Sequence, residues 1–174
     1  MPSLINVLAP AAGAVIGVLL FNKFLSKKLF TKVVSGRNFV SANAHTKAQA
    51  LEMVPAADKC LVYVYRETAE WGDAVGMNFA VDGNIFGRLV CGQFAICEVP
   101  PGAHLLSATY DRRKKPLTEI ALVAQAGDVV VYRFAWEKSG LKATPRGQQI
   151  GDLAAARTAI GAMEMIVPDP AAKA

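Results

Sequence analysis

The sequence predicts a mainly β protein: a single β-sandwich of about seven short strands, with a transmembrane helix before it and an amphipathic helix after it. Three observations predict this fold class. Residues 4–21 are apolar or uncharged throughout. Between residues 60 and 136, short apolar runs alternate with glycine and proline turns at intervals of about 8 to 12 residues, which is typical of sandwiches and barrels. After Asp152 the apolar spacing changes to that of one helix face.

The N-terminal segment, residues 4–21, is predicted to cross a membrane once. At about 1.5 Å per residue, a helix of this length nearly matches a hydrocarbon core of about 30 Å. Gly13 and Gly17 form a small-xxx-small pair and are a candidate helix-packing face. A cleaved signal peptide is the competing interpretation, but it expects basic residues before the apolar segment, and here they follow it. A retained anchor is therefore favoured.

The basic residues after this segment account for the whole net charge of +5. The remaining 14 Lys and Arg equal the 14 Asp and Glu, so the later chain lacks the basic excess that a nucleic-acid-binding domain needs. Nucleic acid is excluded as a partner, and the lipid bilayer is expected as one, because anionic headgroups attract such cations. The five cations are Lys23, Lys27, Lys28, Lys32 and Arg37, the lysines being candidate lipid or partner contacts.

Charge and cysteine content both favour a cytoplasmic domain. Cations just after a first span hold that end on the cytoplasmic side. Cys60, Cys91 and Cys97 are an odd number, so at least one is unpaired, as is common in a reducing compartment. Each cysteine is interpreted as a small buried hydrophobe rather than as a site.

Four parts are expected along the chain: the anchor and basic juxtamembrane helix (1–37), a connector (38–58), the β-sandwich (59–149), and a C-terminal helix with a tail (150–174). The connector should hold a short helix over residues 42–54, ended by Pro55 because the residue before a proline avoids the α region. His45, in this helix, is interpreted as a solvated or packed residue.

The β-domain begins with CLVYVYR, residues 60–66, whose nearly continuous β-branched and aromatic residues predict a central strand covered on both faces. Asp82-Gly83 predicts a two-residue hairpin turn, and Pro100-Pro101-Gly102 predicts a second turn. A third turn, residues 126–128, is expected to close a hairpin, and residues 137–147 are expected to be irregular. The further strands are expected at 75–81, 85–90, 94–99, 105–110, 118–124 and 129–136.

The C-terminal helix is predicted from Asp152, a suitable N-cap. Its apolar positions fall on one face and should cover the sheet; they are Leu153, Ala156, Ile160 and Met163.

Several of these segments resemble the DUF2846 domain family. They are residues 60–66, the turn at 81–83 with Gly87-Arg88-Leu89 after it, the stretch 99–104, and Ala126-Gly127 before a tyrosine-containing strand. The resemblance covers residues 59–136. It implies a prealbumin-like or PEGA-like β-sandwich in a bacterial envelope protein and a periplasmic placement, whereas the charge rule favours the cytoplasm. The family implies no activity.

No catalytic, cofactor-binding or metal-binding residues are predicted, and the chain is not expected to be an enzyme. The spacing of Cys91, Cys97 and His104 fits no zinc motif. His104 follows a proline-glycine turn, where an imidazole can bond a nearby backbone carbonyl. The run Arg112, Arg113, Lys114 and Lys115 is either a solvated hairpin tip or a contact with anionic lipid or an acidic partner.

The favoured function is a non-catalytic, single-pass membrane-anchored module, an accessory or structural subunit of a larger complex in a bacterial inner membrane. The alternative is an envelope-associated binding module for a small ligand, glycan or peptide, with Trp71, Tyr110 and Trp136 as stacking candidates. An exposed aromatic platform would favour the second, and buried aromatic residues the first. Self-association is left open.

Overall fold

The computed structural model describes residues 39–68, 75–110, 116–139 and 142–173. The chain divides into two compact units, Met1–Val34 and Ser35–Ala174, and the described residues belong to the second. Among them, no helix is long and apolar enough to span a bilayer. The predicted anchor with Gly13 and Gly17, and the lysines that follow it, lie outside the described residues.

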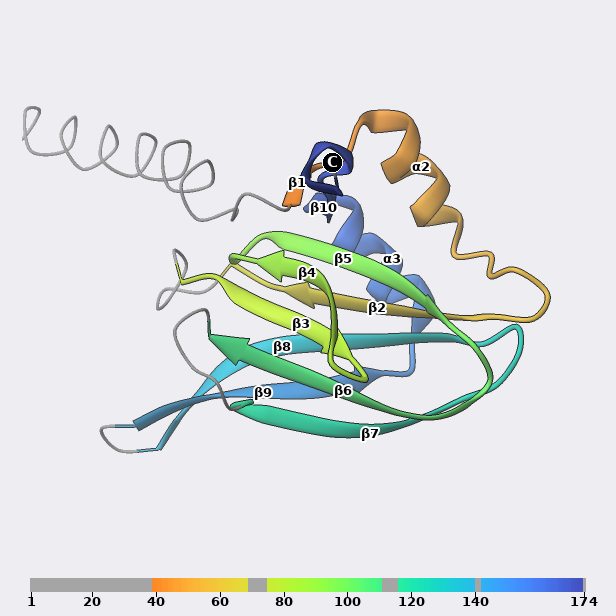
Figure 1. The fold of residues 1–174 in the computed structure, drawn as a ribbon. Coiled ribbons are helices and arrows are strands. Elements are labelled where there is room, and N and C mark those ends of the chain that lie inside the picture. The colour runs from red at the N-terminus through yellow and green to blue at the C-terminus, as the bar shows by residue number, and fades with distance from the viewer. Residues whose placement is uncertain (1–38, 69–74, 111–115, 140–141, 174) are drawn as a thin grey trace, which may run out of the picture. The chain divides into compact units, whose positions relative to one another are not determined.

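The described chain is mainly β, as predicted, and its strands form two sheets (Figure 1). The six-stranded sheet has the order β1-β10-β5-β2-β8-β9, and the four-stranded sheet the order β4-β3-β6-β7. Ten strands are described where about seven were expected: β1 (Phe39–Ser41), β2 (Cys60–Arg66), β3 (Met77–Val81), β4 (Asn84–Leu89), β5 (Gln93–Val99), β6 (Gly102–Tyr110), β7 (Thr118–Ala124), β8 (Val129–Ser139), β9 (Lys142–Ile150) and β10 (Glu164–Pro168).

The six-stranded sheet is the middle of three layers. The helices α2 (Ala44–Glu52) and α3 (Leu153–Gly161) pack on one face, and the four-stranded sheet covers the other (Figure 1). Strand β2 lies in the centre, and all seven of its residues are buried, as predicted. Because side chains alternate along a strand, Val62 and Val64 enter the core between the sheets, whereas Tyr63 and Tyr65 enter the core beneath the helices.

The core between the sheets depends on one close approach. Phe79 of β3 and Phe134 of β8 meet edge to face, with ring centroids 4.7 Å apart. Opposite Phe134 in the neighbouring strand lies Gly147, and a Cβ there would come within 2.5 Å of Ile120 Cδ1 and 2.7 Å of Phe134 Cζ. Only glycine leaves room for the Phe134 ring at this position.

Both helices begin at a capping side chain, of which Asp152 was predicted and Asn43 was not. Asn43 accepts a hydrogen bond from Thr46 N at the start of α2, and Asp152 accepts from Ala154 N and Ala155 N at the start of α3. In α3 the positions Ala156 and Ile160 are buried, whereas Leu153 is 40% exposed. The 3-10 turn η2 (Pro170–Lys173) follows β10.

The predicted turns are present, but one of them joins two strands that were expected to pair as a hairpin and do not. Asp82 and Gly83 have φ of 51° and 81°, as a two-residue hairpin between β3 and β4 requires. Gly127 has φ 83°, but the strands on either side of it, β7 and β8, belong to different sheets. The expected hairpin is therefore wrong; the turn carries the chain from one sheet to the other.

Three strands were not predicted. Strand β9 occupies a region expected to be irregular because it contains Pro145 and Gly147. It is an edge strand, where a proline leaves no ladder partner unsatisfied. Strands β1 and β10 are short: β1 pairs with β10, and β10 pairs with β5, across long sequence separations that local pattern does not reveal.

Candidate functional site

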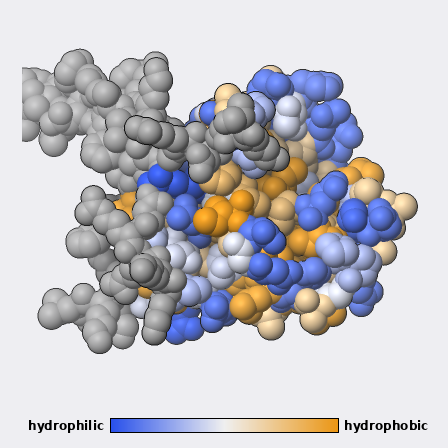
Figure 2. Space-filling view, in the orientation of Figure 1, coloured by the Kyte–Doolittle hydropathy of each residue, from blue (hydrophilic) through white to orange (hydrophobic). Residues whose placement is uncertain are grey.

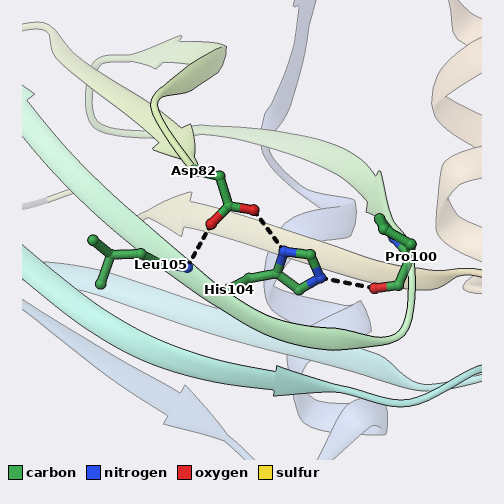
Figure 3. A network of polar contacts seen from close by, with 4 residues as sticks. All are labelled: Asp82, Pro100, His104 and Leu105. Atoms are coloured by element: carbon green, nitrogen blue, oxygen red, sulfur yellow. Dashed lines mark hydrogen bonds and ion pairs between the residues drawn. The ribbon is translucent and has the colours of Figure 1, made fainter.

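The turns Asp82-Gly83 and Pro100-Pro101 lie at one end of the sheets, the turn end, and a histidine joins them. His104, near the start of β6, places Nδ1 2.6 Å from Asp82 Oδ2 and Nε2 2.8 Å from the Pro100 carbonyl oxygen (Figure 3). The other carboxylate oxygen of Asp82 accepts from Leu105 N at 2.9 Å, and Asp82 N donates to Leu105 O at 3.0 Å. These four residues are called the His104 clasp below.

The clasp places a hydrogen-bond acceptor opposite each ring nitrogen. A neutral imidazole carries one N–H and could satisfy only one of them, whereas an imidazolium donates to both. The bond to Asp82, and then the bond to Pro100, raise the pKa of His104 above its ordinary value. The bonds from His104 and from Leu105 lower the pKa of Asp82. The expectation that His104 bonds a nearby carbonyl is confirmed, while its partnership with Asp82 was missed because 22 residues separate them.

A second polar network lies at the opposite end of the sheets, called the arginine end. Arg66 is 2% exposed and donates through Nη1 to Val75 O at 2.5 Å and to Leu89 O at 2.9 Å. Gln93, also 2% exposed, accepts from Val90 N at 2.9 Å. Its Nε2 donates to the carboxylate of Glu164 at 2.8 Å, and Ser41 Oγ donates to the other carboxylate oxygen. This network ties β2, the β4–β5 connection, β10 and β1 together.

Two of the predicted stacking aromatic residues stack on each other. The rings of Tyr110 and Trp136 lie 5.4 Å apart at an interplanar angle of 23°. Both are half-buried and pack against the core between the sheets. Trp136 Nε1 is buried and has no hydrogen-bond partner in the described part of the chain. The pair is thus part of the core's edge rather than an open platform, and Trp71 lies outside the described residues.

The cysteines form no disulfide. Cys60 is fully buried, and Cys91 and Cys97 are half-buried. Burial, with a smaller effect of Cys60, raises the pKa of Cys97 to about 12, so its thiol stays protonated and weakly nucleophilic near neutral pH. Within the ranges that the structure describes, no three His, Cys, Asp or Glu side chains gather as metal ligands would.

The outer face of the four-stranded sheet brings together three of the large apolar side chains that are exposed, Ile85, Leu105 and Val123. In β6, Leu106 is buried while Leu105 is 42% exposed; in β7, Leu122 is buried while Val123 is 72% exposed. Residues paired across strands share a face, so the register defines this surface. The outer face consists of Asn78, Ala80, Ile85, Arg88, Ala103, Leu105, Ser107, Thr109, Glu119, Ala121 and Val123.

This outer face carries few charges and several exposed apolar side chains. Ile85 is 53% exposed, and small side chains separate it from the other large apolar residues. Its charged members are Glu119, paired with Ser107, and Arg88, paired with Asn78. Figure 2 shows apolar residues across the middle of the visible surface, with hydrophilic residues between them. The alternation of inward and outward residues along β7 could have revealed this face. In β6 the alternation is hidden, because the neighbouring Leu105 and Leu106 are both apolar.

The remaining predicted contact residues are not brought into any described site. Arg112, Arg113, Lys114 and Lys115 lie outside the described residues, as do Lys23, Lys27, Lys28 and Lys32. His45 lies on α2 and is exposed.

Comparison with known proteins adds no assignment: no family model matches the chain, and no curated protein is similar to it. The resemblance to the DUF2846 family therefore remains a prediction, which rests on the turns and strands within residues 59–136.

Proposed function

We propose that the chain is a non-catalytic, single-pass membrane-anchored β module that acts as an accessory subunit and docks on a partner membrane protein through the outer face of its four-stranded sheet. The observation that carries this proposal is the exposure of Ile85, Leu105 and Val123 on one sheet face. Contiguous exposed apolar surface on a folded domain marks an interaction site more often than single scattered residues do.

The charges of this face favour a protein as the partner. Glu119 lies within it, and Asp82 lies beside it at the turn end. Arg88 is the one basic residue of this face and is half-buried, whereas anionic headgroups and phosphates require exposed cations. The fitting partner is a protein surface that is apolar, with a basic side chain opposite Glu119.

The other polar features of the domain support a structural role. Both ring nitrogens of His104 and both carboxylate oxygens of Asp82 are engaged in hydrogen bonds within the clasp. Arg66 and Gln93 likewise hold backbone groups. The polar atoms that acid–base chemistry would need are therefore already used in hydrogen bonds that stabilise the fold.

The test compares two valines of equal exposure. Val123, on the outer face, is 72% exposed, and Val54, between α2 and β2, is 74% exposed. In the full chain, extracted from its own membranes in mild detergent, Val123→Lys should release the chain from a larger assembly and weaken the association about tenfold or more, because it places a charge in an apolar contact. Val54→Lys should leave the native mass unchanged.

A photo-cross-linking residue at position 123 should give an adduct with a defined membrane protein, and one at position 54 should not. Glu119→Lys should reduce that adduct. Migration of the unaltered chain as a lone monomer would contradict the proposal. An adduct only with a second copy would replace the partner by self-association.

A further inference from the structure

We infer that the His104 clasp makes docking through the outer face dependent on pH, with the protonated clasp holding the face in its binding conformation. This inference rests on the function proposed above. It follows from the two acceptors around the imidazole and from the backbone bonds that connect Asp82 to Leu105 (Figure 3).

The first step concerns the protonation state that the geometry requires. With Asp82 Oδ2 at 2.6 Å and Pro100 O at 2.8 Å, both ring nitrogens of His104 must donate. Loss of one proton sets a nitrogen lone pair against an oxygen lone pair at one of these two contacts. The ring then has to move away from either the carboxylate or the carbonyl.

Within the ranges that the structure describes, no charge other than that of Asp82 acts on the ring to compensate for this loss. Asp82 on the β3–β4 turn is the charged group that acts on His104. The β5–β6 turn presents the Pro100 carbonyl, and β7 places Leu122 opposite His104. The His104 side chain is 9% exposed, so water solvates little of the ring, whereas the Asp82 side chain is 47% exposed.

The second step connects the clasp to the docking surface. Asp82 bonds Leu105 at both its N–H and its C=O, and Leu105 is one of the three large apolar residues of the outer face. Asp82 also begins the tight turn that leads into β4, which carries Ile85. The clasp therefore fixes Leu105 relative to Ile85, and its loosening alters the shape that a partner contacts.

The direction of the effect follows from the linkage between pKa and structure. Because the fold raises the pKa of His104, the clasp is complete below the ordinary pKa of histidine, as long as Asp82 stays ionised, and weakens as the pH rises through the raised pKa of His104. Docking should accordingly weaken by roughly fivefold between about pH 6 and about pH 9, a typical coupling between two sites.

The experiment measures two quantities on the full chain. Nitrogen-15 resonances of labelled histidine, recorded in detergent micelles, report whether His104 remains doubly protonated above the ordinary histidine pKa of 6.5. The yield of the photo-cross-link from position 123, measured in native membranes over the same pH range, reports docking. His104→Gln should remove the pH dependence of the yield, and His45→Gln should preserve it, because His45 is an exposed residue of α2 and no member of the clasp.

Each outcome decides the inference. The inference is supported if the pKa of His104 is raised, if the cross-link yield decreases as the pH rises, and if the yield of the His104→Gln chain does not depend on pH. A His104 pKa at the ordinary value overturns the inference. A raised His104 pKa with a cross-link yield that does not change with pH overturns it as well. In both cases the proposed function stands. If no adduct forms at any pH, the proposed function fails and this inference with it, while the histidine spectra still report on the clasp. Circular dichroism of His104→Gln distinguishes loss of pH dependence from loss of fold.

Discussion

The turn end and the arginine end of the sheets are each held together by polar side chains, but of different chemistry. At each end a polar side chain ties a chain connection to a neighbouring strand. At the arginine end, Arg66 and Gln93 are almost fully buried and act through a permanent charge and a neutral amide. At the turn end, His104 and the half-exposed Asp82 both titrate. The arginine end should therefore respond to removal of a side chain, and the turn end to pH.

The largest effect is expected from Arg66→Met. The substitution leaves the buried carbonyl oxygen of Leu89 and the part-buried carbonyl oxygen of Val75 without their guanidinium donor, at about 1–3 kcal/mol for each. The free energy of unfolding, measured by urea denaturation in detergent micelles, should fall by about 3 kcal/mol. Arg133→Met is the matched control: the Arg133 side chain is 38% exposed and pairs with Glu67 at 3.7 Å, so its loss should change stability by less than about 1 kcal/mol. Equal losses of unfolding free energy in Arg66→Met and Arg133→Met would contradict the argument that the burial of Arg66 makes it the more stabilising residue.

An intermediate effect is expected from Gly147→Ala, which tests packing along β9. The new Cβ would overlap Ile120 and the Phe134 ring and destabilise the chain by about 1–3 kcal/mol. Gly151, just after the other end of the same strand, has no atom within 4 Å of an added Cβ. Gly151→Ala should leave the thermal midpoint almost unchanged; a larger loss there than at Gly147 would contradict the packing argument.

The smallest effect, and the most direct comparison of the ends, is the pH dependence of two backbone amides. Leu105 N–H donates to Asp82, and Val90 N–H donates to Gln93. The contribution of His104 is complete below its ordinary pKa and is lost as the pH rises through its raised pKa. The contribution of Asp82 is complete above its ordinary pKa and is lost as the pH falls through its lowered pKa.

Hydrogen exchange, corrected for the intrinsic rate, should therefore show Leu105 protection that is highest at intermediate pH and decreases on both sides. Val90 protection should stay constant on the high-pH side of that range, because neither Gln93 nor the amide it holds titrates there. Parallel pH profiles for the two amides would show that global unfolding, not the clasp, dominates the exchange.

Local sequence predicted the elements whose cause is local. The double-sided burial of β2, the Asp82-Gly83 turn and the Asp152 cap all follow from neighbouring residues. The sheet to which each strand belongs did not follow, because Gly127 specifies a turn without specifying its partners. Pro145 concealed β9, since a proline argues against a strand unless the strand is known to lie at an edge.

The candidate site was predictable only in part for the same reason. His104 could be expected to bond a carbonyl four residues before it, because that contact lies within one turn. Its bond to Asp82 and the alignment of Ala80 with Ser107 and Glu119 depend on the pairing of β3, β6 and β7, which no short window contains.

The position of β10 between β1 and β5 has a consequence for biosynthesis. Strand β1 is made early, but β10, the strand it pairs with, consists of residues 164–168. On the ribosome, Phe39–Ser41 must therefore wait for more than a hundred further residues before its backbone groups find their ladder partners. Such distant pairing slows folding, and the sheet closes only after nearly all of the chain has been synthesised.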